Sequence, residues 1–216
     1  MSEDRHSRAE TVDLIKDPDA KARREAENGV RQFNTAVHLI RAHIPNHDGS
    51  FRLRQSTILK LHKEALDGIH ALAGTYRNTR VFIEKSDHLP PQSVDVPDHV
   101  AEMCDYVNSN WEERNAVHLA SYALWRTNWI HPFADGNGRT ARVVSYLVLS
   151  VKLNSLLPGT PTIPDLIAAD KAPYYAALEK ADQEWRFQRV DLSAMEALLE
   201  RLLAAQLLNA TREAGL

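Results

Sequence analysis

Residues 131–142 read HPFADGNGRTAR, and this polar stretch interrupts the most apolar part of the chain. On either side, residues 112–130 and 139–153 carry apolar side chains at the spacing of a helix. Pro132 disfavours helical geometry at His131, so the first helix should end there. The glycines of GNG permit a tight loop that leads into the second helix. The pattern predicts two core helices joined by a loop whose polar groups need a role other than packing.

Helical periodicity extends through most of the remaining chain. It covers residues 19–44, 50–73, 98–111, 163–185 and 191–216. Residues 75–85, TYRNTRVFIEK, are rich in β-branched and aromatic side chains and predict a short strand or hairpin near residues 78–84. We therefore expect an all-α bundle with one small β-hairpin. It comprises a flexible N-terminus (1–16), an N-terminal helix (17–45) and a main domain with the C-terminal helices (46–216).

Composition narrows the class of protein. Of the 216 residues, 44% are hydrophobic and 25% charged, which is ordinary for a globular domain with a core. The formal net charge of -3 argues against a nucleic-acid partner. A single cysteine excludes an intrachain disulfide and favours a reducing compartment. No apolar run is long enough for a membrane span and no signal peptide is visible, so we expect a cytoplasmic protein without a membrane partner.

The polar loop has the composition of a phosphate site. Gly136, Asn137 and Gly138 lead into a helix, whose first N–H groups and partial positive charge attract anions. Arg139 and Arg142, three residues apart, add two guanidinium groups on one helix face. A carboxylate just before this cradle, Asp135, would repel bare phosphates but would suit a Mg²⁺ ion that bridges them. His131 is a candidate general base.

Each of these features has a simpler interpretation on its own. A single G-x-G is usually a loop, a histidine at a helix end usually packs, and an arginine is usually a solvated charge. The combination within 12 residues favours phosphate or nucleotide transfer. Elsewhere, no zinc-binding spacing occurs, the four tryptophans predict core packing, and the basic run KARR predicts a solvated helix face.

The stretch closely resembles the core motif of the Fic family, H-P-F-x-D/E-G-N-G-R-x-x-R, at every specified position. The likeness extends over roughly residues 20–205, and includes GTYRNTRVFIEKSDHLPPQSVDVP before the motif and KAPYYAALEKAD after it. The resemblance implies a Fic-fold helical bundle with a β-hairpin flap. It also implies transfer of AMP from ATP, with Mg²⁺, to a Tyr, Thr or Ser hydroxyl of a target protein.

The resemblance also implies roles for individual residues. His131 would be the general base and Asp135 the Mg²⁺ ligand. Gly136, Asn137 and Gly138 would form the anion hole, Arg139 and Arg142 would hold the outer phosphates, and Phe133 would pack in the core. The target-docking flap would comprise Arg80, Val81, Phe82, Ile83 and Glu84. The related Doc kinases usually carry lysine at the second glycine, so Gly138 favours the AMP-transferring branch.

Many family members carry an inhibitory helix with the pattern S/T-x-x-x-E-G/N. Here Glu27 and Asn28 match its end, although Arg23 stands where Ser or Thr is expected. The resemblance implies that Glu27 pairs with Arg142 and keeps the γ-phosphate away. A solvated helix acid is the simpler interpretation of Glu27.

Several alternatives remain open from the sequence. The site could transfer another nucleotide or phosphate, or could remove AMP, with Glu27 orienting a water. The chain could also be an autoinhibited binding module, or a toxin restrained by a separate antitoxin, although an intact base argues against a pure binding role. Self-modification is a further alternative to a separate target. The broad apolar face of the last helix would suit either the core or a homodimer.

Overall fold

The structure is a computed structural model, and it describes residues 7–8, 13–44 and 51–215. Within them the fold is all-α, as the sequence predicts. The helices are α1 (Pro18–His43), α2 (Gln55–Leu66), α3 (Val96–Ser109), α4 (Ala116–Ile130), α5 (Asn137–Lys152), α6 (Ile163–Ala169), α7 (Ala172–Trp185) and α8 (Ser193–Glu213). A 3-10 turn, Ser93–Asp95, precedes α3, and two short strands are β1 (Ser7–Arg8) and β2 (Phe82–Ile83).

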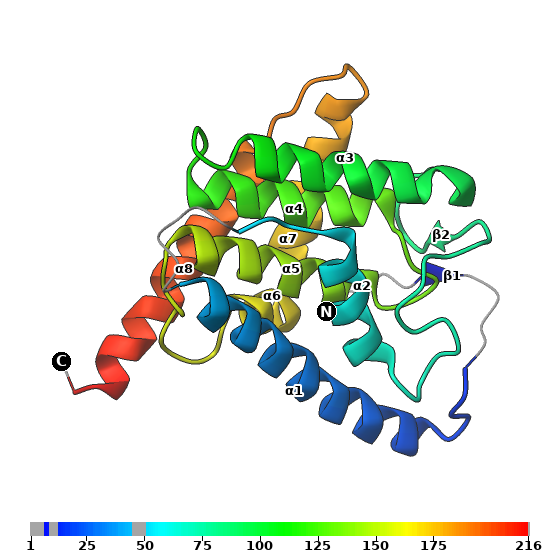
Figure 1. Cartoon of the computed structure of the whole chain (residues 1–216), viewed down its shortest axis with the longest axis horizontal. Helices are drawn as coiled ribbons and strands as arrows, with labels where there is room; N and C mark the ends of the chain where they lie inside the picture. The colour runs from blue at the N-terminus through cyan, green and yellow to red at the C-terminus, as the bar shows by residue number, and fades with distance from the viewer. Residues whose placement is uncertain (1–6, 9–12, 45–50, 216) are drawn as a thin grey trace.

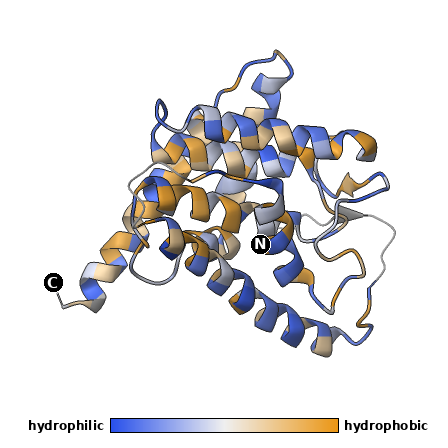
Figure 2. Cartoon of the chain, viewed as in Figure 1, coloured by the Kyte–Doolittle hydropathy of each residue, from blue (hydrophilic) through white to orange (hydrophobic). Residues whose placement is uncertain are grey.

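The bundle is organised around α5. This helix packs against α4, α1, α2 and α6, and from Val143 to Val151 every residue of it is buried. Figure 1 shows it in the middle of the molecule, and Figure 2 shows that it is among the most hydrophobic segments. A helix that is apolar nearly all round can be stable only when neighbours cover every face. The N-terminus of α5, where the polar loop lies, is therefore fixed by the core itself.

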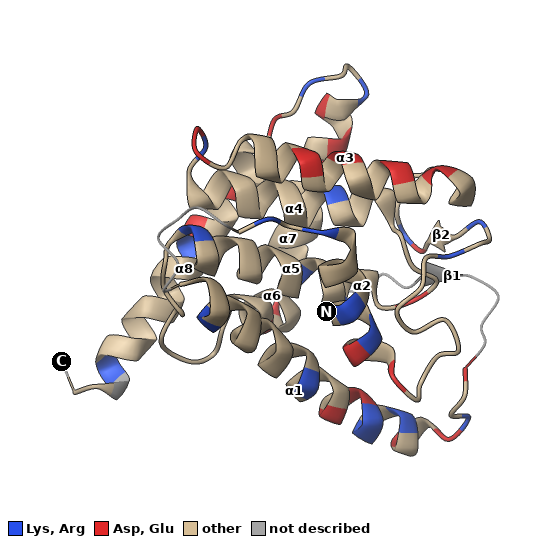
Figure 3. Ribbon diagram, in the orientation of Figure 1, with Lys and Arg blue, Asp and Glu red and all other residues tan. Residues whose placement is uncertain are grey.

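Helix α1 docks on α2 through a polar seam. The Asn28 side chain is fully buried, and its Nδ2 donates to the carbonyl oxygens of Ala65 (3.2 Å) and Asp67 (2.9 Å) at the end of α2. One turn later, Gln32 Nε2 donates to Leu61 O at 3.1 Å. Asn28 and Gln32 thereby satisfy carbonyl groups and set the register of the two helices. Figure 3 shows that most of the charged residues of α1 lie in its first half.

The β element differs from the predicted hairpin. Strand β2 pairs antiparallel with β1, so that Ser7 faces Ile83 and Arg8 faces Phe82 (Figure 1). After β2 the chain turns at Lys85, whose φ is 58°, and Pro90 and Pro91 follow without the N–H groups that a returning strand needs. The strand therefore takes its partner from the N-terminal region. Much of the predicted flexible N-terminus (1–6 and 9–12) lies outside the described residues.

The tryptophans pack in or against the core, as predicted. Trp111 and Trp125 are buried, and Trp129 and Trp185 pack against the main cluster. The guanidinium carbon of Arg126 lies 4.0 Å from the ring centre of Trp129 and 4.6 Å from that of Trp185, a cation–π arrangement.

Helix α8 begins in the core and ends outside it. Met195, Leu198 and Leu199 are buried, whereas Leu208 is exposed and the end of the helix extends away from the bundle (Figure 1). The predicted homodimer stays a prediction. Among the described residues, no helix has the length and apolarity to cross a bilayer.

Candidate active site

The polar loop opens into a pocket of about 540 Å³, a volume suited to a nucleotide-sized ligand. Its walls come from the loop, α1, β2, the end of α4 and α7. The lining residues are Lys21, Glu25, Ile83, Ser86, His88, Asn128, Trp129, His131, Asp135, Gly136, Asn137, Gly138, Arg139, Arg142, Lys171, Tyr174, Tyr175, Leu178 and Asp182. The structure thus brings His131, Asp135, GNG and both arginines to one cavity.

The loop keeps its shape through Asn137 and Gly136. The Asn137 side chain closes the loop with two hydrogen bonds, since its Oδ1 accepts from Phe133 N (2.9 Å) and its Nδ2 donates to Phe133 O (2.8 Å). Gly136 has φ of 77°, and a Cβ there would lie 2.5 Å from a methyl carbon of Leu66. Only glycine fits that position. The Asn137 side chain therefore fixes the shape of the loop, and its backbone N–H is the group that can bind an anion.

The start of α5 supplies the donors of an anion site. The N–H groups of Asn137, Gly138 and Arg139 lie in the first turn, where no acceptor exists within the helix. The helix dipole adds a partial positive charge of about half a unit at this end. Arg139 and Arg142 line the same pocket and add two full charges. A Cβ at Gly138 would lie 3.4 Å from Arg142 Nη1, so a side chain there would crowd that guanidinium.

His131 lies at the end of α4 in a left-handed conformation, with φ of 50° and ψ of 59°. This agrees with the prediction that Pro132 excludes helical geometry there. The ring Nδ1 donates to Asn128 O at 3.3 Å, a tautomer that leaves Nε2 as the basic nitrogen of the neutral ring. Burial lowers the pKa of His131 to about 4. The imidazole is therefore neutral at pH 7 and able to accept a proton.

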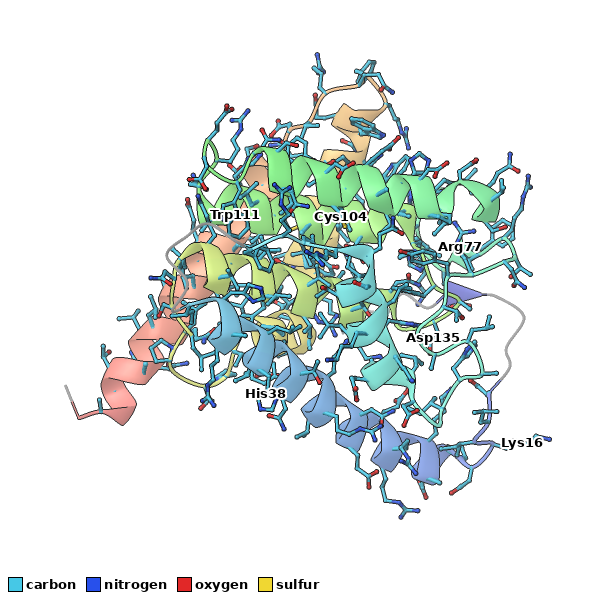
Figure 4. The ribbon with its side chains drawn as sticks, in the orientation of Figure 1. Lys16, His38, Arg77, Cys104, Trp111 and Asp135 are labelled. Atoms are coloured by element: carbon cyan, nitrogen blue, oxygen red, sulfur yellow. The ribbon has the colours of Figure 1, made fainter. Side chains whose placement is uncertain are left out.

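Arg77, which sequence reasoning missed, holds the backbone around His131. Its side chain is buried, with Nε donating to His131 O at 2.8 Å and Nη1 donating to Thr79 O at 3.0 Å. Its Nη2 donates to Pro91 O, and its backbone N–H donates to Pro132 O at 2.9 Å. In Figure 4, Arg77 and Asp135 lie on the same side of the molecule as β2. One guanidinium thus joins the end of α4 to Thr79, which precedes β2, and to Pro91, which follows it.

His62 fixes the other side of the loop and was also missed. Its Nε2 donates to Asp135 O at 3.0 Å, and its Nδ1 accepts from Gly74 N at 3.0 Å. Its ring stacks on Phe133, with the ring centres 3.6 Å apart and the planes at 4°. Burial lowers the pKa of His62 to about 4, so this bridge is neutral. No sequence signal distinguishes this histidine or Arg77, because each contacts carbonyl groups far away in the chain.

Asp135 is half-exposed at the pocket edge. Its Oδ1 accepts from Gly136 N at 2.6 Å, and its Oδ2 lies 3.4 Å from Arg139 Nη2. Mg²⁺ in nucleotide sites is commonly held by one or two carboxylates, with phosphates and water completing the shell. A single carboxylate beside an anion cradle fits that donor set. Among the described residues, no group of three or more His, Cys, Asp or Glu gathers as a metal site of protein ligands alone.

The acidic residue of α1 at the pocket is Glu25 and not Glu27. Glu25 Oε1 lies 3.4 Å from Arg139 Nη1, whereas Glu27 points outward, with its side chain 67% exposed and 3.8 Å from Arg24. The reason is helical phase, because Glu25 and Asn28 are three residues apart and share the face that docks on the bundle. Asn28 serves that docking. The structure therefore does not bring Glu27 to the phosphate cradle.

Helix α7 and the segment after β2 also line the pocket. Tyr174, Tyr175 and Leu178 supply apolar surface. His88 Nε2 donates to Trp129 O at 2.7 Å, and Asp182 Oδ1 accepts from Trp125 Nε1 at 2.8 Å. This wall is fixed to α4, and its aromatic surface suits a flat heterocycle.

Of the five predicted flap residues, only Ile83 lines the pocket. Val81 is buried, Phe82 is 56% exposed, and Arg80 is exposed. Phe82 and Ile83 form β2, so the pocket and the strand pairing meet at Ile83.

Comparison with known proteins agrees with this geometry. Residues 52–149 match the model of the Fic/DOC family. A protein adenylyltransferase Fic from Nematostella vectensis is 34% identical over 128 residues, which cover 58% of this chain and 28% of the relative. The protein adenylyltransferase fic-1 of Caenorhabditis briggsae is 30% identical over 152 residues, which cover 68% of this chain and 28% of the relative. The chain spans little more than a quarter of these relatives.

Solved structures show the same fold. A fragment of Fic-1 from C. elegans superposes with a TM-score of 0.69 at 20% identity, covering 93% of this chain and 54% of that one. BepC from Bartonella tribocorum, solved with bound AMPPNP, has a TM-score of 0.54 at 16% identity and covers 87% of this chain and 88% of that one. The match to the Fic/DOC family covers residues 52–149, and the chain has the fold of the Fic structures.

The buried Arg77 bridge predicts a stability effect. Arg77→Lys keeps the charge but loses the planar fork, so carbonyl groups that now accept its hydrogen bonds would lose their donors. We expect the free energy of unfolding to fall by about 2–4 kcal/mol. Arg201→Lys, at an exposed position on α8, should stay within about 0.5 kcal/mol of wild type. Equal denaturant midpoints for the two variants would contradict the bridge.

The two buried imidazoles predict an acid-sensitive fold. The pKa values of His62 and His131 lie near 4 in the folded state, against 6.5 as their ordinary value. Between pH 4 and pH 6.5 the unfolded chain binds more protons than the folded chain. The free energy of unfolding therefore falls as the pH drops from about 6.5 to about 4. Each ring contributes on the order of 3 kcal/mol to this loss.

Denaturant titrations across this pH range would measure the effect. His62→Gln should remove about half of the pH dependence, because an amide can donate and accept as the ring does but does not titrate. His38→Gln, at an exposed position (labelled in Figure 4), should leave the dependence unchanged. An unchanged slope in His62→Gln would contradict the assignment.

Proposed function

We propose that this protein transfers AMP from ATP to a hydroxyl group of a protein side chain. One observation carries the proposal: the N-terminal N–H groups of α5, Arg139 and Arg142 lie in the same pocket as the buried, neutral His131. The first groups suit a polyphosphate, and a neutral imidazole suits deprotonation of an attacking hydroxyl. The names of the relatives, protein adenylyltransferase, support the same chemistry.

The reaction follows from the order of groups in the pocket. The target hydroxyl attacks the α-phosphorus, and its proton passes to His131 Nε2. The bond between the α-phosphorus and the oxygen bridging to the β-phosphate breaks, and pyrophosphate leaves. The α5 N–H groups and the two arginines hold the phosphates and stabilise charge that develops on them. Asp135 would hold Mg²⁺, which would supply positive charge against the phosphates.

The aromatic wall supports a nucleoside triphosphate over inorganic phosphate. Tyr174 and Tyr175 line the same pocket as the start of α5, and they offer aromatic surface to a base and ribose. The BepC structure was solved with AMPPNP, an ATP analogue. A phosphate alone would leave this apolar surface without a role.

Labelled ATP tests the proposal. With ATP labelled at the α-phosphate and Mg²⁺, we expect label on protein with wild type and a loss of at least about a hundredfold with His131→Ala, because a general base contributes roughly that much or more. His38→Ala, at an exposed position, is the matched control. Label from γ-phosphate appearing on protein, with none from α-phosphate, would instead indicate a kinase.

We further propose that an acid of α1 restrains the site, and the geometry supports Glu25 over Glu27. The Glu25 carboxylate lies at the Arg139 guanidinium, so incoming phosphates must displace it. Both side chains of this pair are about one-third exposed, and such pairs are worth only about 0.2–1 kcal/mol. A restraint of this kind is modest and can be released by the triphosphate itself.

Two isosteric variants separate these acids. Glu25→Gln should raise the rate at low ATP by about two- to fivefold, the factor that corresponds to an energy of up to about 1 kcal/mol. Glu27→Gln should match wild type, because its exposed carboxylate lies beside Arg24 and does not line the pocket. Steady-state label transfer across an ATP series would measure both. Activation by Glu27→Gln alone would favour Glu27 as the restraining acid and contradict the assignment to Glu25.

A further inference from the structure

We propose that the Tyr106 hydroxyl is a nucleophile activated by His118 and Glu196, and that it is a site of covalent modification by small, neutral acyl donors. None of these three side chains lines the pocket that holds His131. They lie on α3, α4 and α8, and α4 packs against both of the other helices. Figure 1 shows α3 and α4 side by side. The inference is therefore independent of the proposed AMP transfer.

The imidazole of His118 links the other two side chains. Its Nδ1 lies 2.6 Å from Glu196 Oε1, and its Nε2 lies 2.9 Å from the Tyr106 hydroxyl oxygen. An ionised carboxylate only accepts hydrogen bonds, so Nδ1 carries the proton of the neutral ring. Nε2 is then the acceptor, and the Tyr106 hydroxyl donates to it. Glu196 thereby sets the tautomer in which His118 can take the hydroxyl proton.

This order of groups activates a weak nucleophile. A hydroxyl becomes reactive when a base within hydrogen-bonding reach removes its proton and a third group orients that base. Burial raises the pKa of Tyr106, so the hydroxyl keeps its proton at pH 7. Attack by Tyr106 therefore needs a proton acceptor, and His118 supplies one. Glu196 acts through His118 and is a positioning residue.

The cluster is open to a small reagent. The side chain of His118 is 15% exposed and that of Glu196 is 33% exposed, and Tyr106 is likewise only partly buried. The Tyr106 ring stacks on Tyr122, with the ring centres 3.7 Å apart, which holds the phenol in place. The three side chains of the cluster bring one negative charge and no positive one. This charge favours a neutral acyl donor over an anionic phosphoryl donor.

The transfer balances with N-acetylimidazole, a neutral acetyl donor. The Tyr106 oxygen forms a bond to the carbonyl carbon, and the bond from that carbon to the imidazole nitrogen of the reagent breaks. The hydroxyl proton passes to His118 Nε2 and then to the departing imidazole. The product is the acetyl ester of Tyr106, and His118 and Glu196 return to their starting states.

Tyr76 is a matched control within the same chain. It is also partly buried, burial also raises its pKa, and its hydroxyl donates to Gln55 Oε1 at 2.9 Å. An amide oxygen accepts a hydrogen bond but does not titrate, so Tyr76 has a partner and no base. With limiting N-acetylimidazole near pH 7, peptide mass spectrometry should show acetylation of Tyr106 at least about tenfold faster than that of Tyr76.

Two isosteric variants separate the base from its hydrogen bonds. His118→Gln can still accept from Tyr106 and donate to Glu196, but it takes up no proton. It should lower the ratio of Tyr106 to Tyr76 acetylation at least about tenfold. Glu196→Gln can donate to His118 Nδ1, which would move the ring proton to Nε2, so a similar loss is expected. His99→Gln changes a different His–Glu pair, on α3, and should match wild type.

The Tyr76 rate is an internal standard, because a variant that loosens the whole fold would expose both tyrosines. The ratio of the two rates therefore reports on the base and not on stability. A wild-type ratio near or below one would overturn the proposal, and so would a ratio that is unchanged in His118→Gln. A ratio that falls in His118→Gln but not in Glu196→Gln would keep the base and overturn the role of Glu196.

Discussion

The guanidinium of Arg77 is the interaction on which the site depends. It donates to His131 O and Thr79 O, and through Nη2 to Pro91 O, so one buried charge joins α4 to both ends of the segment that carries β2. Within the described part of the chain, its side-chain hydrogen bonds run to backbone carbonyl oxygens. A buried charge is costly unless it is hydrogen-bonded throughout, and this arrangement meets that condition. His131 and the segment that carries β2 are therefore held by the same group.

Two residues at the loop, His131 and Gly136, have positive φ angles, and different contacts hold each of them. His131 adopts a left-handed conformation that costs a β-carbon-bearing residue about 1–2 kcal/mol. Arg77 and the α4 carbonyls hold it there. Gly136 avoids that cost but packs so closely on Leu66 that no side chain fits. His62 and Asn137 hold the loop between these points, so they fix the position at which α5 begins.

The sequence predicts the fold and the centre of the site because both are local. The helices follow from apolar periodicity, and HPFADGNGRTAR carries His131, the GNG loop and both arginines, which line one pocket, in one contiguous segment. Arg77 and His62 could not be predicted, because their roles arise from carbonyl groups brought together by tertiary packing. The inhibitory-helix pattern points to Glu27 as the restraining acid. The docking of Asn28 on α2, however, sets a helical phase that turns Glu25 to the pocket. The pairing of β2 with β1 is equally non-local, and adjacent residues suggested a hairpin instead.

The central claim is that the start of α5 cradles a nucleoside triphosphate with its α-phosphate facing His131. A crystal structure of the His131→Ala variant with a non-hydrolysable ATP analogue and Mg²⁺ would test it most directly. The account predicts phosphate oxygens within hydrogen-bonding distance of the Asn137, Gly138 and Arg139 N–H groups, the base against Tyr174 and Tyr175, and the α-phosphorus nearest to position 131. A γ-phosphate nearest to that position, or a nucleotide bound away from α5, would contradict it.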